Sequence, residues 1–140
     1  MIYSYDFPLR TRYVETDNMG IVHNSNYFRY FEQARVETMR QCGISYFDIE
    51  AKGVIMPVVE QYCRYLNVSY WDQEITIRTT IDELPMAHLK LSYFVFRYEK
   101  DGSQTPIARG WNTLGFLDKA TNKAMRCPQW IIEKLQEFVH

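Results

Sequence analysis

Hydrophobic and polar residues alternate along most of the chain, a pattern typical of β-strands that bury one face. The clearest example is 74–84, where Ile75, Ile77 and Ile81 share one side. Other extended segments are predicted at 7–14, 57–70, 89–98 and 107–117. Because short polar turns such as 100–103 join the later segments, we expect strands two to five to form a mostly antiparallel meander.

One long segment instead has the period of a buried helix. Ser25 and Asn26 are residues whose side chains cap a helix start, and Gly43 is a typical helix stop. The aromatic residues between them are expected to pack in the core: Tyr27, Phe28, Tyr30 and Phe31. Glu32 and Arg35, three apart on the same helix, predict a structural ion pair.

A short second helix or a turn is expected at 45–52, and a final helix from Pro128 to His140. The predicted order is therefore strand, helix, four strands and helix, with no repeat or linker. Hydrophobic residues make up 46% of the 140 residues, which is enough for one core. We expect a single α+β domain over 1–140.

Charge and composition exclude several classes of partner. There are 16 Lys and Arg against 17 Asp and Glu, a net charge of -1, so nucleic acid is not expected as the main partner. The N-terminal residues do not resemble a signal peptide, and no apolar run approaches a membrane span. We expect a cytoplasmic protein.

Cysteine and histidine are scattered along the chain. The three cysteines have no Cys-x-x-Cys spacing, and no two histidines form a metal-binding pair on a helix. These residues are Cys42, Cys63, Cys127, His23, His88 and His140. We expect reduced cysteines, no metal and no cofactor.

The loop before the long helix carries the most suggestive chemistry. A helix start presents free N–H groups that can hold a developing oxyanion, and Asp17 lies just upstream. A carboxylate and N–H donors around one carbonyl would suit hydrolysis of an activated acyl group. The alternative is that Asp17 is only a turn residue beside Gly20.

The same loop resembles a known family signature. The run is Thr16-Asp17-x-x-Gly20-Ile21-Val22-x-x-x-x-Tyr27-x-x-x-Phe31-Glu32-x-Ala34-Arg35, and Val59-Glu60, Arg64-Tyr65 and Trp71-Asp72 continue it. It resembles the hotdog-fold acyl-CoA thioesterases of the 4-hydroxybenzoyl-CoA thioesterase-like group. That resemblance implies a five-stranded antiparallel sheet, in the order 1-3-4-5-2, wrapped around the long central helix. It also implies homodimers whose sheets join, or homotetramers, and hydrolysis of acyl-CoA.

The resemblance assigns roles to residues of the loop. Asp17 would act on the thioester as nucleophile or as base for water, and backbone N–H groups around Asn24 would polarise the carbonyl. Many relatives carry His or Tyr at the position of Asn24, whereas here His23 precedes it, so His23 is either a site-lining residue or a base. Tyr13 would support Asp17 or be a buried aromatic. Gly20 and Tyr27 are the other substrate-site candidates.

Coenzyme A also requires cations for its phosphates. The candidates by position are His88, Lys90, Lys123 and Arg126.

The same fold supports other activities. A dehydratase would need a His-rich motif that is absent, and a second thioesterase branch places its carboxylate within the helix, at Glu32 or Glu37. A non-catalytic binder or scaffold on this fold is the remaining alternative. A desolvated Asp17 beside the helix start would favour the enzyme, and an Asp17 facing bulk water would favour the binder.

Overall fold

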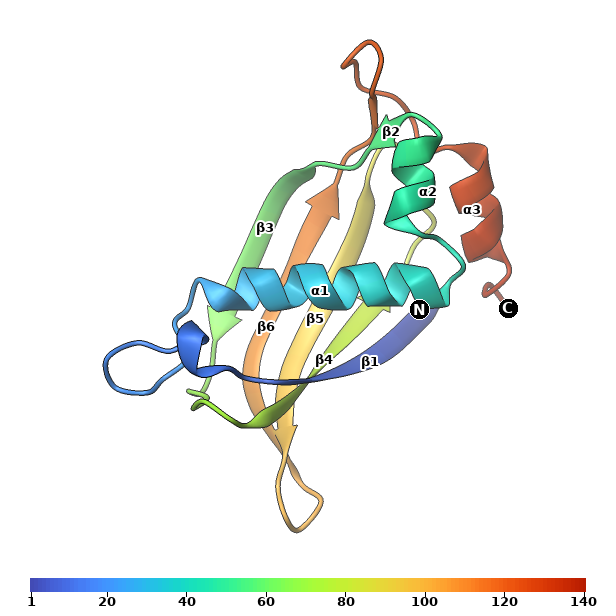
Figure 1. The fold of residues 1–140 in the computed structure, drawn as a ribbon. Helices are drawn as coiled ribbons and strands as arrows, with labels where there is room; N and C mark the ends of the chain where they lie inside the picture. Colours follow the sequence, from blue (N-terminus) through green and yellow to red (C-terminus); the bar gives the residue numbers. More distant parts are fainter.

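The computed structural model describes residues 1–140 (Figure 1). In chain order its elements are β1 (Tyr3–Arg10), a 3-10 turn (Tyr13–Glu15), α1 (Asn26–Gln41), α2 (Tyr46–Ala51), β2 (Val54–Ile55), β3 (Val58–Tyr65), β4 (Glu74–Ile81), β5 (Leu89–Tyr98), β6 (Gln104–Leu114), β7 (Leu117–Asp118) and α3 (Gln129–Gln136). None of the helices is long and apolar enough to cross a membrane.

Five long strands form one antiparallel sheet in the order β1-β4-β5-β6-β3. Numbered along the chain, these five strands have the order 1-3-4-5-2, so the α+β class and the sheet order are both confirmed. The helix α1 crosses one face of the sheet (Figure 1). Only β4, β5 and β6 form the expected meander, because β3 pairs with β6 at the far edge rather than with β4.

The core lies between α1 and the sheet. The inward residues of β4 predicted from its alternation, Ile75, Ile77 and Ile81, are all fully buried. Phe31 of α1 stacks on Tyr93 of β5, with ring centroids 4.3 Å apart. Close approach of the helix requires glycine beneath it: a Cβ on Gly110 would lie 2.5 Å from Phe31 Cε2 and 2.4 Å from the Tyr62 carbonyl oxygen.

Several predicted boundaries were wrong. The first strand is Tyr3–Arg10 rather than 7–14, because its residues pair one for one with β4 from Tyr3 opposite Ile81. The chain then turns, which leaves Tyr13 in a 3-10 turn with 73% of its surface exposed. The second strand ends at Tyr65, before a bend in which the N–H groups of residues 66 and 67 share the Ile107 carbonyl.

The predicted ion pair between Glu32 and Arg35 was also wrong. Glu32 is exposed, whereas Arg35 is buried beneath α1 and donates hydrogen bonds to Tyr46, Tyr93 and Asn112. The spacing of the two residues places them near each other on the helix, but Arg35 finds its acceptors on the sheet and on α2. The cysteines are free, and two of them, Cys42 and Cys127, are buried.

Candidate active site

Residues 16–22 form a tight hairpin that projects beside the start of α1 (Figure 1). Thr16 bridges Val22, the Asp17 N–H donates to the Ile21 carbonyl at 2.8 Å, and the Gly20 N–H donates to the Asp17 carbonyl at 3.1 Å. Gly20 has a φ of +74°, a backbone conformation that favours glycine. The glycine of the signature is therefore needed for the shape of this loop.

The Asp17 carboxylate is held by its own loop. Its Oδ1 accepts the N–H groups of Met19 at 2.8 Å and Ile21 at 3.2 Å, whereas Oδ2 accepts no hydrogen bond within the chain. Asp17 thus does what a turn residue does and still keeps one oxygen free. Asp17 is exposed in the single chain. An Asp17 that faces bulk water is what we expect of a non-catalytic binder, so the single chain taken alone favours that alternative.

Glu15 fixes this hairpin to α1, a role that sequence reasoning missed. Its Oε1 accepts the Tyr30 hydroxyl at 2.8 Å and the Arg12 N–H at 2.7 Å, and its side chain is only 12% exposed. Its carbonyl accepts the His23 N–H at 2.9 Å and Asn26 Nδ2 at 2.7 Å. Burial, followed by the hydrogen bond to Glu15, raises the pKa of Tyr30. No periodicity or spacing connects Glu15 to Tyr30, so only the folded structure reveals the contact.

The start of α1 is capped differently from the prediction. Neither Ser25 nor Asn26 caps the helix with its side chain, and Asn26 Nδ2 donates instead to the Glu15 carbonyl. Instead His23 Nδ1 accepts the Ser25 N–H at 3.2 Å and lies 2.8 Å from the Ser25 hydroxyl. The Asn24 N–H donates no hydrogen bond within the chain, so it remains free for a ligand.

A hollow of about 160 Å³ lies next to Asn24. It is lined by Ile21, Val22, Asn24, Tyr27, Tyr65, Asn67 and Val68. Tyr27 is buried, and the Tyr65 hydroxyl at the end of β3 donates to the Asn24 carbonyl at 3.2 Å. Tyr13 does not join this group: it packs edge-on against Trp71, and its hydroxyl makes no hydrogen bond. The loop candidates Asp17, Gly20, His23 and Asn24 are therefore together, with Tyr27 beside them.

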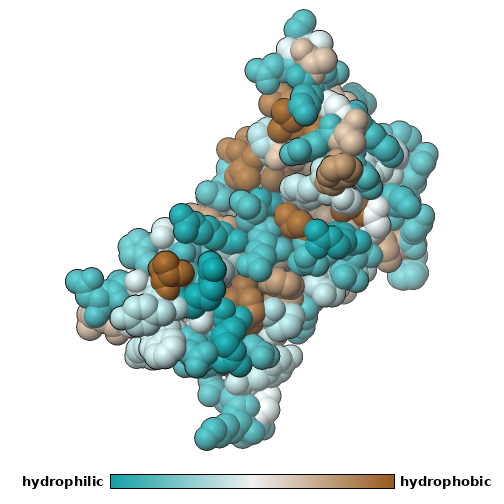
Figure 2. Space-filling model, in the orientation of Figure 1, coloured by the Kyte–Doolittle hydropathy of each residue, from teal (hydrophilic) through white to brown (hydrophobic).

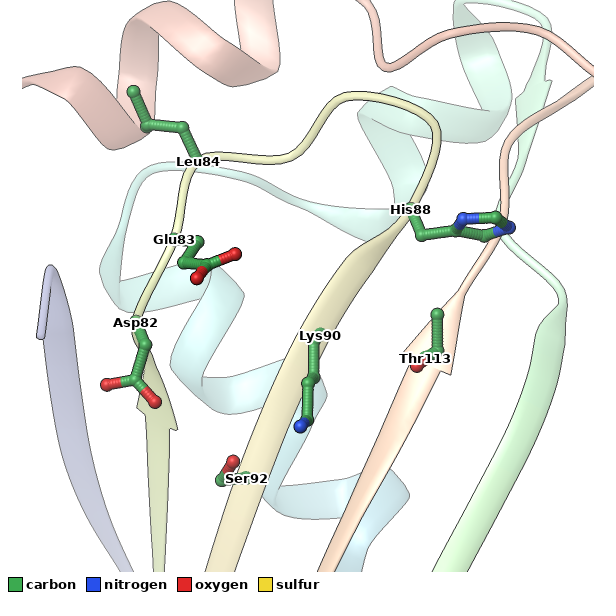
Figure 3. Close-up of a pocket in the computed structure, with 7 residues that line it drawn as sticks. All are labelled: Asp82, Glu83, Leu84, His88, Lys90, Ser92 and Thr113. Carbon is green, nitrogen blue, oxygen red and sulfur yellow. The ribbon is translucent and has the colours of Figure 1, made fainter.

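The predicted phosphate-binding cations lie elsewhere. His88 and Lys90 line a cavity of about 370 Å³ together with Asp82, Glu83, Leu84, Ser92 and Thr113. Figure 3 shows the two acidic side chains on one side of this cavity, His88 on the other and Lys90 between them. Lys123 and Arg126 are exposed in the segment between β7 and α3. Register places Lys90 level with Thr113 and Glu60, near the start of β3, whereas the Asp17 loop contacts its end. Within one chain Lys90 and the loop before α1 are thus separated along β3 by the five residue steps from Glu60 to Tyr65, about 17 Å.

β3 is an open sheet edge. It pairs with β6 on one side only, and seven of its eight residues are exposed. Figure 2 shows hydrophobic surface at the upper left, over the start of this strand, where Val58 and Val59 are 43% and 55% exposed. A long unpaired strand with apolar residues is a surface that proteins normally cover.

The sequence and the fold both have known relatives. Residues 11–135 match the thioesterase-like superfamily. A putative esterase of Aquifex aeolicus is 38% identical over 128 residues, which cover 91% of this chain and 94% of that protein. A DHNA-CoA thioesterase from Staphylococcus aureus has a TM-score of 0.83 and 26% identity, covering 96% of this chain and 91% of that one. The 4-hydroxybenzoyl CoA thioesterase from Pseudomonas sp. strain CBS-3 has a TM-score of 0.82 at 23% identity, covering 94% and 98% of the two chains, and is similar in fold.

Proposed function

The chain belongs to the thioesterase-like superfamily and is a thioester hydrolase with the hotdog fold, and we propose that it hydrolyses acyl-CoA to a free acid and coenzyme A through Asp17. The observation that carries the proposal is that two free groups lie seven residues apart in the loop before α1. Asp17 Oδ2 and the Asn24 N–H both lack partners within the chain, while the backbone N–H groups of residues 19–23 between them are all engaged.

The carboxylate supplies the attacking group. Acting as base, Asp17 takes a proton from water, and the water oxygen attacks the thioester carbon. Acting as nucleophile, Asp17 forms a mixed anhydride that water then hydrolyses. In both routes the carbon–sulfur bond breaks and coenzyme A leaves as the thiol. The two bonds to Oδ1 hold the carboxylate in place without using the oxygen that would react.

The start of α1 stabilises the oxyanion. The Asn24 N–H lies at the positive end of a 16-residue helix, so a carbonyl oxygen placed there is polarised as negative charge develops. His23 does not act as the base in this account, because its Nδ1 already accepts the Ser25 N–H. It instead fixes the turn that leaves Asn24 free, and Gly20 and Tyr27 shape the acyl site beside it.

Two copies of the chain complete the site. Antiparallel pairing of β3 with β3 of a second copy would cover the open edge and bring the Val58 end of one strand beside the Tyr65 end of the other. His88, Lys90, Lys123 and Arg126 of one copy would then approach the Asp17 loop of the other copy, where they could bind the phosphates of coenzyme A. The same contact would remove Asp17 from bulk water. We therefore infer a homodimer at least, with a homotetramer as a further assembly.

Thiol release from a panel of acyl-CoA substrates of different chain length and polarity tests this function. We expect saturable release of coenzyme A by a protein whose light-scattering mass is about 34 kDa or a multiple of it, since one chain is 16.8 kDa. Binding of acyl-CoA without thiol release would instead support the binder. A stable 16.8 kDa monomer that hydrolyses acyl-CoA would overturn the shared site and leave the activity standing.

A further inference from the structure

Arg35 is a buried cation for which the chain supplies no anion. Only 6% of its surface is exposed, and no carboxylate lies within 4.0 Å of its nitrogen atoms. Its Nε donates to the Tyr46 hydroxyl at 3.2 Å, and its Nη1 is 3.3 Å from the Tyr93 hydroxyl and 3.3 Å from Asn112 Oδ1. Burying a charge without a counter-charge is costly, and natural proteins rarely leave one so.

The groups around Arg35 do not provide a negative charge. Burial raises the pKa of Tyr93 and of Tyr46, so both hydroxyls stay neutral at neutral pH. Tyr93 hydrogen-bonds to Asn112 Oδ1 as well, while Asn112 Nδ2 is buried and has no acceptor. Arg35 Nη2 also makes no hydrogen bond within the chain. The network therefore has more donors than acceptors.

Arg35 lines a cavity of about 280 Å³ between α1, α2 and the start of β3. Seven of its ten lining residues are hydrophobic: Val36, Tyr46, Ile49, Val54, Ile55, Met56 and Val58. The other three are Arg35 and two exposed carboxylates, Glu32 and Glu50, which are hydrated rather than buried. An apolar pocket into which one buried charged group converges is a usual form of small-molecule site, and Arg35 is the only buried charged residue of this lining.

The cavity lies where an acyl group would arrive in the proposed dimer. Val58 lines it at the start of β3, whereas the Asp17 loop contacts the end of β3 through Tyr65 and Asn24. Antiparallel pairing of two β3 strands brings these two ends together across the interface. An acyl group attached at the Asp17 loop of one copy can therefore extend into the Arg35 cavity of the other.

We propose that this cavity receives the distal end of the acyl group and that Arg35 binds a carboxylate carried there, so that the preferred substrates are ω-carboxyacyl thioesters. The substrate preference rests on the proposed function, whereas binding of a carboxylate in the cavity does not. A guanidinium presents paired donors that match a carboxylate, and the ligand would supply both the missing acceptors and the missing charge.

Hydrolysis of a matched pair of substrates tests the preference. We expect kcat/KM for adipoyl-CoA to exceed that for hexanoyl-CoA by about 10- to 100-fold, the scale of a hydrogen-bonded charge. Arg35→Met should abolish this ratio, and Arg35→Lys should retain part of it. Arg29→Met, which removes an exposed cation from the same helix, should leave the ratio unchanged. A wild-type enzyme that favours hexanoyl-CoA, or an Arg35→Met enzyme that keeps the preference, would overturn the proposal.

Thermal stabilisation by free ligands tests the cavity without any hydrolysis. We expect hexanoate to raise the Tm of the wild-type protein more than hexanamide does at equal concentration, and to lose this advantage in Arg35→Met. If that variant does not fold, the wild-type comparison decides alone, and equal shifts by the two ligands contradict the proposal. If the protein hydrolyses neither thioester but hexanoate still stabilises it selectively, the proposed function fails while the carboxylate site stands.

Discussion

Removing the Tyr30 hydroxyl should loosen the loop that carries Asp17. In the folded chain this hydroxyl donates to Glu15 Oε1 at 2.8 Å, and Tyr30 is only 2% exposed. This hydrogen bond connects the second turn of α1 to Glu15 at the base of the hairpin. Tyr30→Phe deletes this bond with almost no change of volume, so its effect reports on the bond rather than on packing.

The expected loss of stability is moderate. A hydrogen bond to a charged group contributes about 1.5–3 kcal/mol. Glu15 keeps its two bonds from Arg12 and remains 12% exposed, which places the loss near the middle of that range, about 2 kcal/mol. With an unfolding entropy of about 2.1 cal/mol/K per residue, that loss lowers the Tm by roughly 7 °C. The fold should survive, but kcat should fall by about tenfold or more, because displacement of a catalytic group by 1 Å can cost far more than that.

Urea unfolding and steady-state kinetics measure the two effects. Tyr98→Phe is the matched control, because Tyr98 is 54% exposed and its hydroxyl makes no hydrogen bond. A double-mutant cycle with Glu15→Gln should give a coupling energy above about 1 kcal/mol. A loss below about 0.5 kcal/mol for Tyr30→Phe, with unchanged kcat, would refute the idea that Glu15 and Tyr30 position the loop.

Two further predictions concern the core. Gly110→Ala should lower the free energy of unfolding, measured in urea, by about 3 kcal/mol, because its Cβ would meet the Tyr62 carbonyl oxygen at 2.4 Å. Gly115→Ala should cost much less, because its Cβ meets only a methyl group of the exposed Val59, at 3.2 Å. Equal costs would contradict this. Burial raises the pKa of Cys42 to about 11 and of Cys127 to about 12, so folding favours the protonated thiols. The unfolded chain loses these two protons above about pH 9, whereas the folded chain keeps them. The two thiols should therefore not change the free energy of unfolding below pH 9, and they should decrease it from pH 9 to 11. The double variant Cys42→Ala, Cys127→Ala should lose this decrease of the free energy of unfolding with pH. A decrease that persists in the double variant would show that other groups cause it.

Much of the sheet was predictable from alternation alone. The strand at 89–98 was predicted with its observed bounds, because Leu89, Leu91, Tyr93 and Val95 point inward in regular alternation and a tight polar turn follows. The order of the strands was not accessible in this way. Alternation says which face of a strand is buried but not which strand lies beside it, and the position of β3 at the edge came only from the family resemblance.

The loop was predictable in identity but not in its contacts. Spacing located Asp17, Gly20 and the start of α1, but it did not show that His23 holds the turn before the helix or that Glu15 anchors the hairpin. Such side-chain choices depend on neighbours that are distant in sequence. Arg35 illustrates the same limit: helical spacing assigned it to Glu32, but its hydrogen bonds go to β5, β6 and α2.

The most direct test of the account is the hydrolysis rate of Asp17→Asn. The asparagine side-chain oxygen can still accept the N–H groups of Met19 and Ile21, so the loop, the fold and the oligomer should be unchanged. The amide can neither attack a thioester nor take a proton from water at neutral pH, and kcat should fall by about 10²–10⁴. Asn24→Ala should cost less, because its backbone N–H remains. A normal kcat for Asp17→Asn would contradict the account and move the catalytic carboxylate to Glu32 or Glu37 on α1.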